Sequence, residues 1–175
     1  MGKVILNIAC SLDGFIAGEN DNIDFLNSVA KEGEDYGYSE FYSGVGTVIL
    51  GRKTFEKVLT LTGGVNPHSE KAVWVLSRTS VSPVAEVNYY SGDVSGLIKE
   101  IKRGSDKDVY CDGGAEVVLL LMNLNLIDEM IISIIPTILG KGTKLFKDGI
   151  YPVNLKLIKS KSFSTGLVQL RYSLV

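Results

Sequence analysis

The sequence predicts an α/β protein built on a mixed sheet that is parallel in its centre, with an antiparallel C-terminal hairpin and helices on both faces. Two observations predict this class. Nearly continuous apolar runs alternate with helix-like segments through residue 124, a pattern typical of a largely parallel sheet covered by helices. Beyond that point the alternation stops, and the chain ends in two apolar segments separated by a turn signal.

Four apolar runs predict the central strands, because a strand covered on both faces reads as a continuous apolar segment. They are residues 4–10, 47–50, 72–76 and 108–111. Four helix-like stretches follow or separate them, at residues 34–43, 53–59, 94–102 and 115–124. Asp93 is placed as an N-cap of the third helix and Gly104 as its stop.

The C-terminal third predicts three further strands. Residues 130–135 form one, and residues 155–163 and 167–174 flank Ser164-Thr165-Gly166 as a hairpin. In residues 168–174 apolar and polar side chains alternate, as expected for an antiparallel strand with one wetter face. No repeat or linker divides the sequence, so residues 1–175 are expected to form a single domain.

Composition excludes several function classes. A net charge of -2 disfavours nucleic-acid or membrane binding as the main role. With His68 as the only histidine and two separated cysteines, multi-histidine and four-cysteine metal sites are excluded. Cys10 and Cys111 end apolar runs and are expected to be buried, reduced thiols. The start does not resemble a signal peptide, and no apolar run is long enough to span a bilayer, so a cytoplasmic location is expected.

Three predicted strand ends carry chemistry that suits phosphate groups. In α/β sheets, ligands bind beyond the carboxyl ends of the parallel strands, where helix N-termini favour anions. After the second strand comes Gly51-Arg52-Lys53-Thr54, and after the third comes Ser77-Arg78, whose guanidinium suits a phosphate monoester. The alternative for each is a solvated surface loop.

The third such end is Asp112-Gly113-Gly114-Ala115, where paired glycines let a diphosphate approach the backbone. A diphosphate site together with a separate phosphate site indicates a dinucleotide with an extra phosphate, and NADP has that shape. The G-x-G-x-x-G fingerprint is absent, which disfavours an ordinary dehydrogenase domain. The alternative is that the paired glycines form a strand-to-helix turn that binds no ligand, and this would be the preferred interpretation if the motif stood alone.

The loop at residues 11–18 follows the first strand and carries Asp13, two glycines and apolar residues that suit a flat ring. Hydride transfer needs no protein nucleophile, but it needs a proton donor, for which Asp112 and Asp13 are the catalytic candidates. The alternatives are that Asp112 caps the following helix and that Asp13 only shapes its loop.

Five motifs in order resemble the dihydrofolate-reductase-like superfamily, and more narrowly stand-alone homologues of the C-terminal reductase domain of the riboflavin-biosynthesis deaminase/reductase, RibD. They are Ala9-Cys10-Ser11-Leu12-Asp13-Gly14, Leu50-Gly51-Arg52-Lys53-Thr54-Phe55-Glu56, Val75-Leu76-Ser77-Arg78, Asp112-Gly113-Gly114, and Ile127-Asp128-Glu129 continuing to Leu145-Phe146. The resemblance covers nearly the whole chain.

This resemblance implies an NADPH-dependent reductase of a small heterocyclic substrate, acting as a homodimer. It places Ala9, Ile16, Ala17 and Gly18 near the nicotinamide and Gly51, Arg52, Lys53 and Thr54 on the phosphates. It places Ser77 and Arg78 on the 2′-phosphate and Gly113, Gly114, Ala115 and Glu116 at the diphosphate. The apolar segment 117–122 is then core or interface, with core the preferred interpretation.

The substrate side departs from the riboflavin-pathway pattern. Asn7 stands where those reductases usually carry a lysine, and the acidic, tyrosine-rich residues 34–41 replace an arginine-bearing helix. Dihydrofolate reductases instead engage the pterin through a carboxylate in the first helix, for which Asp35 and Glu40 are the options. The leading hypothesis is a reductase like that for 5-amino-6-(5-phosphoribosylamino)uracil. The alternatives are a dihydrofolate or other pterin reductase, and a non-catalytic NADP-binding regulatory domain.

Overall fold

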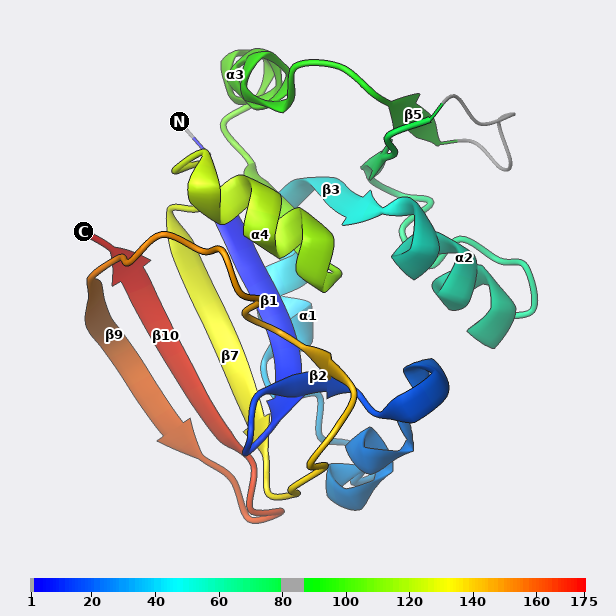
Figure 1. The fold of residues 1–175 in the computed structure, drawn as a ribbon, viewed down its shortest axis with the longest axis vertical. Coiled ribbons are helices and arrows are strands. Elements are labelled where there is room, and N and C mark those ends of the chain that lie inside the picture. The colour runs from blue at the N-terminus through cyan, green and yellow to red at the C-terminus, as the bar shows by residue number, and fades with distance from the viewer. Residues whose placement is uncertain (1, 80–86) are drawn as a thin grey trace.

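An eight-stranded mixed sheet forms the middle of the molecule in this computed structural model, which describes residues 2–79 and 87–175 (Figure 1). Its strands are β1 (Val4–Ser11), β3 (Val45–Gly51), β4 (Ala72–Leu76), β5 (Asn88–Tyr90), β6 (Asp108–Gly113), β7 (Glu129–Ile135), β9 (Leu155–Ser162) and β10 (Val168–Leu174). Their order across the sheet is β5-β4-β3-β6-β1-β7-β10-β9. Neighbours from β5 to β7 are parallel, whereas β10 is antiparallel to β7 and β9. The predicted mixed sheet and C-terminal hairpin are confirmed.

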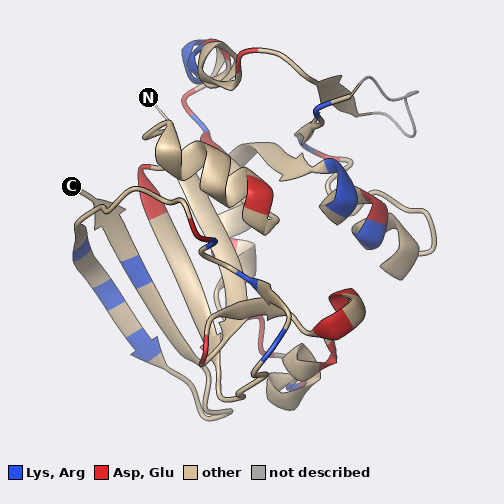
Figure 2. Cartoon of the chain, in the orientation of Figure 1, with Lys and Arg blue, Asp and Glu red and all other residues tan. Residues whose placement is uncertain are grey.

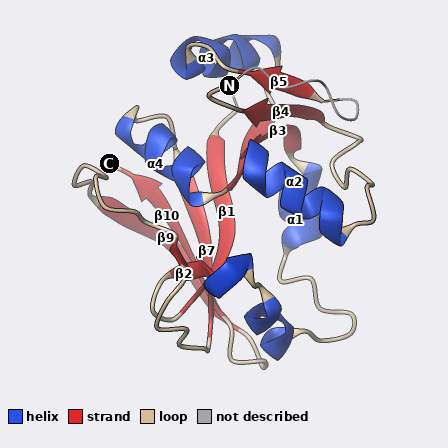
Figure 3. Ribbon diagram, turned by 45° about the vertical axis from the view of Figure 1, so that its right-hand side comes forward, coloured by secondary structure: helices blue, strands red, loops and turns tan. Residues whose placement is uncertain are grey.

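Helices lie on both sides of the strands, as predicted (Figure 3). They are α1 (Tyr38–Ser43), α2 (Arg52–Leu61), α3 (Val94–Gly104) and α4 (Ala115–Asn123), with 3-10 turns η1 (Glu19–Asp21) and η2 (Asp24–Val29). Packing assigns α3 and α4 to one face, and α1, α2 and η2 to the other. Two short strands, β2 (Phe15–Ala17) and β8 (Thr143–Lys144), pair separately with each other.

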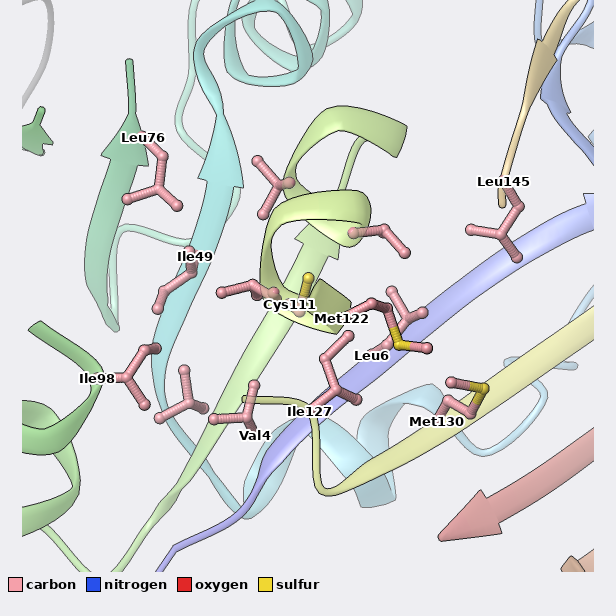
Figure 4. Packing of buried hydrophobic residues seen from close by; sticks show 14 of the residues in the cluster. Val4, Leu6, Ile49, Leu76, Ile98, Cys111, Met122, Ile127, Met130 and Leu145 are labelled. Atoms are coloured by element: carbon pink, nitrogen blue, oxygen red, sulfur yellow. The ribbon is translucent and has the colours of Figure 1, made fainter. Parts of the chain in front are cut away.

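Burial on both faces explains the continuous apolar runs. In β3, Ile49 packs towards α4, whereas Val48 and Leu50 pack with Phe55 of α2 on the other face. All four side chains are fully buried. Full burial of a side chain of this size contributes about 1.5–3 kcal/mol. Figure 4 shows Ile49 on β3, beside α4, in the largest cluster of buried residues.

Both cysteines are buried and free, as predicted. Cys111 lies in the cluster under α4, and burial raises the pKa of its thiol to about 12. In α4 itself, Val118 and Leu121 are fully buried, whereas Leu120 is 39% exposed. The apolar segment 117–122 therefore serves mainly as core.

The predicted helix over residues 34–43 is wrong in its first turn, because α1 begins only at Tyr38. The carboxylate of Asp35 accepts the N–H groups of Gly37 and Ser39, and Gly37 has a φ of +80°. These bonds make a turn in place of a helical start. The described residues contain no helix that is both long and apolar enough to cross a membrane.

Asp128 and Glu129 join four elements at the start of β7. Asp128 accepts the Val4 N–H of β1 at 2.7 Å and Lys102 of α3 at 2.7 Å. Glu129 is 5% exposed and pairs with Lys3 and with Arg171 of β10. These two motif residues thus hold the N-terminal strand and the hairpin against β7.

Candidate active site

Three strand ends meet at one edge of the sheet, because β3, β4 and β6 are parallel. The Gly114 N–H, at the start of α4, donates to Thr54 Oγ1 of α2 at 2.8 Å. A Cβ added at Gly114 would lie 3.9 Å from the Cδ1 atom of Ile16 in β2. The structure therefore brings the predicted diphosphate, phosphate and nicotinamide segments together around Gly114.

Cations gather at this edge, and Figure 2 shows them at the start of α2. The pKa of Glu116 is lowered by a hydrogen bond from Lys147 and by the charges of Lys147, Arg78 and Lys53. Lys53 and Arg78, which follow different strands, are therefore both close to the start of α4. The position of Lys147 could not be predicted from the sequence, because its proximity to Glu116 depends on the path of the segment before β9.

Two residues predicted to contact phosphate groups, Arg52 and Ser77, also interact with other residues of the protein. Arg52 pairs with Glu56 one turn further along α2, at 2.8 Å. The Ser77 hydroxyl donates to the Thr79 carbonyl at 2.8 Å, and its N–H donates to the Tyr90 carbonyl at 2.9 Å. Ser77 thus shapes the turn that presents Arg78, whose side chain is exposed.

Two glycines at this edge allow neighbouring parts of the chain to pack closely. A Cβ at Gly114 would meet Thr54 Oγ1 at 3.0 Å, and one at Gly51 would meet a Val117 methyl at 3.2 Å. Gly113 has a φ of +87°, which favours glycine. A close backbone, the N-terminus of a nine-residue helix and nearby cations fit a diphosphate.

The sheet opens between β1 and β6 beside these glycines. The pairing of β1 with β6 ends at Leu6 with Cys111, whereas its pairing with β7 continues to Ser11 with Ile135. Ala9 of β1 lies along the unpaired part. The unpaired part of β1 lies beside Gly113, where a Cβ added to this glycine would meet the Cδ1 atom of Ile8 at 3.3 Å.

A cavity of about 370 Å³ lies on the face of the sheet covered by α1 and η2. The lining includes Asn7 and Asp35, predicted for the substrate, Asp112, predicted for catalysis, and Ala9, predicted to lie near the nicotinamide. Glu40 is exposed and is not among the described residues that line the cavity. The structure therefore favours Asp35 over Glu40 as the carboxylate that faces a substrate.

Asp112 is oriented by a neighbour on the same strand. The Tyr110 hydroxyl donates to Asp112 Oδ1 at 2.5 Å. Burial, and then the negative charge of Asp112, raise the pKa of Tyr110 well above its ordinary value, so its hydroxyl stays protonated. The alternative that Asp112 caps α4 is wrong, because the N-cap residue of α4 is Gly114 and no side chain caps this helix.

Asp13 joins two loops. It accepts the Ser11 hydroxyl at 2.6 Å and the N–H groups of Leu139 and Gly140 at 3.1 and 2.7 Å. These bonds, that of Ser11 first, lower the pKa of Asp13 to about 2. Asp13 is not among the described residues lining the cavity, so the structure supports its loop-shaping role and leaves Asp112 as the better-placed proton donor.

The family model of the RibD C-terminal domain matches residues 2–169. The chain belongs to this family. The uncharacterized protein YwjB of Bacillus subtilis (strain 168) is 40% identical to it over 171 residues, covering 97% of each chain. A solved structure from Shewanella sp. PV-4, assigned to riboflavin biosynthesis, is 30% identical, with a TM-score of 0.90 over 99% of each chain.

The dihydrofolate-reductase-like fold of this RibD C-terminal domain protein is likewise confirmed. Dihydrofolate reductase from Enterococcus faecalis, solved in complex with NADP(H), superimposes with a TM-score of 0.68. It covers 99% of this chain and 96% of its own, at 15% sequence identity, and so shows the shared fold alone.

Aromatic side chains are the part of the cavity that the sequence did not assign. Tyr36, Tyr38, Phe41 and Tyr110 line it together with polar and aliphatic groups. Tyr110 was within reach of prediction, because residues two apart on a strand share a face and Asp112 was already singled out. The tyrosines before and within α1 carried no such signal.

Proposed function

We propose that this RibD C-terminal domain protein is an NADPH-dependent reductase of a small heterocyclic compound. One observation carries the proposal: the segments predicted to bind phosphates meet around Gly114, two residues after Asp112, which lines the cavity beside the part of β1 that β6 leaves unpaired. A cofactor bound at the edge and a substrate bound in the cavity would meet beside that part of β1.

In this proposal the protein binds both the phosphate end and the nicotinamide end of NADPH. The backbone at Gly114 and the Thr54 hydroxyl bind the diphosphate, and Arg78 with Lys53 binds the 2′-phosphate. Ile16 and the neighbouring Ala17 and Gly18 lie beside the nicotinamide, with Ala9 across the opening. The bound cofactor supplies the hydride, and the protein aligns it with the substrate.

Asp112 supplies the proton on the other side. The Tyr110 hydroxyl donates to Oδ1, which leaves Oδ2 as the oxygen that would carry the proton to the reduced nitrogen or oxygen of the substrate. Asn7 and Asp35 line the same cavity and orient the heterocycle through hydrogen bonds. In this proposal Asp35 helps to bind the substrate, whereas Asp112 transfers the proton.

A binding titration tests the cofactor assignment. NADPH and NADH are titrated against the wild type and Arg78→Ala, with Arg103→Ala at the far end of α3 as a matched control. We expect Arg78→Ala to lose about 1.5–3 kcal/mol of NADPH affinity, roughly 10- to 150-fold in Kd, because charge-assisted contacts to the 2′-phosphate are removed. Equal wild-type affinity for the two cofactors would overturn the assignment.

Turnover distinguishes an enzyme from a binding domain. NADPH oxidation is followed with ribosylaminopyrimidine and pterin substrates, in the wild type and Asp112→Asn. We expect Asp112→Asn to lose roughly 100-fold or more in kcat while binding NADPH normally. NADPH binding without oxidation by any of these substrates would identify a non-catalytic, regulatory domain instead.

A pterin reductase is the second candidate, and the charge of the cavity favours it. The described residues that line the cavity include two carboxylates, Asp35 and Asp112, and no lysine or arginine. Such a lining suits a neutral or cationic ring with N–H donors better than a phosphate-bearing substrate. Faster turnover of dihydrofolate than of the ribosylaminopyrimidine, lost in Asp35→Asn, would support this candidate.

A further inference from the structure

The only histidine of the chain is buried behind the candidate proton donor. His68 lies in the loop between α2 and β4 and is 6% exposed. The backbone N–H of His68 donates to Asn66 Oδ1 at 3.0 Å, and the backbone carbonyl of His68 accepts the backbone N–H of Lys71 at 2.9 Å. These bonds fix the loop so that the imidazole enters the space between α1 and β6.

The imidazole belongs to a row of four polar side chains. Tyr42 Oη lies 3.0 Å from His68 Nδ1, and His68 Nε2 lies 3.6 Å from Asp112 Oδ2. On the far side of the carboxylate, Oδ1 accepts the Tyr110 hydroxyl at 2.5 Å. Asp112 and Tyr110 line the cavity, whereas His68 and Tyr42 are not among its described lining residues. His68 thus approaches the one carboxylate oxygen that Tyr110 leaves free.

Charged and titratable groups from three elements surround this imidazole. From β6, Asp112 is the facing charge, and the Tyr110 ring packs edge-on with its centroid 6.0 Å from that of the imidazole. From α1, Tyr42 faces it, and burial, then the charges of Glu70 and Asp112, raise the pKa of Tyr42. From the loop itself, the Lys71 amine lies 4.7 Å from the centre of the Tyr42 ring.

Proton transfer at neutral pH needs such a partner. Aspartic acids ordinarily ionise well below neutral pH, whereas histidine changes charge close to it. A carboxylate that protonates a substrate at neutral pH therefore needs a nearby proton source. Once cofactor and substrate fill a cavity, water is excluded from that role.

We propose that His68 is a positioning residue that stores the transferred proton and passes it through Asp112 to the substrate. The Nε2–H bond of the imidazolium breaks as an Oδ2–H bond forms, and that proton then bonds to the substrate nitrogen or oxygen. The substrate carbon gains the hydride, so the substrate is reduced and the nicotinamide cofactor is oxidised. A proton from water restores the imidazolium after product release. The 3.6 Å separation has to shorten for transfer, as catalytic contacts commonly do when substrate binds.

The first test uses the free protein and is independent of the proposed function. Because His68 is the only histidine, its ring signals in a proton NMR titration need no assignment. We expect Asp112→Asn to move the midpoint of that titration to lower pH, because a negative charge 3.6 Å from His68 Nε2 is lost. Asp35→Asn, a carboxylate in the same cavity, is the matched control and should leave it in place. An unmoved midpoint in Asp112→Asn would overturn the proposal.

The second test uses turnover and rests on the proposed function. His68→Gln keeps a hydrogen-bonding group but cannot carry the charge. We expect kcat at neutral pH to fall roughly tenfold or more, with KM unchanged, a larger solvent deuterium isotope effect, and a smaller loss at acidic pH. Tyr42→Phe removes the partner of Nδ1 and should change the pH profile in the same direction by less.

The outcomes separate the possible roles. If His68→Gln lowers stability but leaves the pH profile and isotope effect unchanged, the residue is only structural and the proposal fails. If His68→Gln does not fold, Tyr42→Phe and the NMR comparison decide. If the wild type reduces no heterocycle, the proposed function fails, whereas the coupling of His68 to Asp112 is still decided by the NMR titration.

Discussion

The buried carboxylate of Glu129 allows a quantitative test of what holds the hairpin to the sheet. Its side chain is 7% exposed, and Arg171 of β10 contacts Oε2 through Nε at 2.7 Å and Nη2 at 2.6 Å. Lys3 contacts the other oxygen. Burial alone raises the pKa of Glu129, but the hydrogen bonds and charges of Lys3 and Arg171 outweigh it and hold the pKa below its usual value. The substitution Glu129→Gln keeps the size of the side chain and removes the charge.

The expected magnitude follows from the exposure of the partners. Hydrogen bonds to charged groups contribute about 1.5–3 kcal/mol when buried, whereas exposed ion pairs contribute roughly 0.2–1 kcal/mol. The side chains of Arg171 and Lys3 are 40% and 55% exposed, so the contacts fall between these limits. We expect Glu129→Gln to lower the free energy of unfolding by about 2 kcal/mol at neutral pH.

The pH dependence has a definite sign. Because the folded-state pKa of Glu129 is lowered, its contribution is present above the ordinary glutamate pKa and is lost as pH falls through the folded value. Urea unfolding of wild type and Glu129→Gln at neutral pH and at about pH 3.5 measures this, with exposed Glu100→Gln on α3 as control. The difference between wild type and variant should shrink in acid. An equal loss at both pH values would refute the charge-based explanation and point to packing.

Three further outcomes are expected. Leu121→Ala should lower the free energy of unfolding by about 2–5 kcal/mol in urea titrations, because the side chain is fully buried under α4. Asp13→Asn should speed hydrogen exchange at the Leu139 and Gly140 amides, and since the pKa of Asp13 is about 2, wild-type protection should persist until pH falls through that value. Cys111, with a pKa of about 12, should resist iodoacetamide at pH 8 until the protein unfolds, as mass spectrometry would show.

Strands and strand ends were predictable because they depend on local pattern. Residues 48–50 around Ile49 are all apolar because both faces of the strand are covered, and the residues after each parallel strand fall at one edge. The predicted phosphate-binding segments therefore met at Gly114 without any knowledge of their distances. β5 was missed because three residues are too few for a periodic signal.

Long-range placement was not predictable from periodicity. Asp13 is held by amides 126 and 127 residues away, so its loop-joining role depends on where the segment after β7 passes. His68, in a polar loop, carried no sign of burial, because its position depends on α1 and β6 closing around it. A strand pattern identifies a face, but it does not identify the side chains that another element brings to that face.

The central position of β1 has a consequence for biosynthesis. Val4 pairs with Val109, and Ile5 pairs with Glu129, so β1 acquires its neighbours only after about 100 further residues have been synthesised. At roughly 5–20 residues per second, this apolar strand spends about 5–20 s without them. An incomplete chain that lacks β6 and β7 would expose β1 as an unpaired apolar strand. Pairing of this central strand therefore has to wait for synthesis of the second half of the sheet, and until then its apolar surface is open to aggregation.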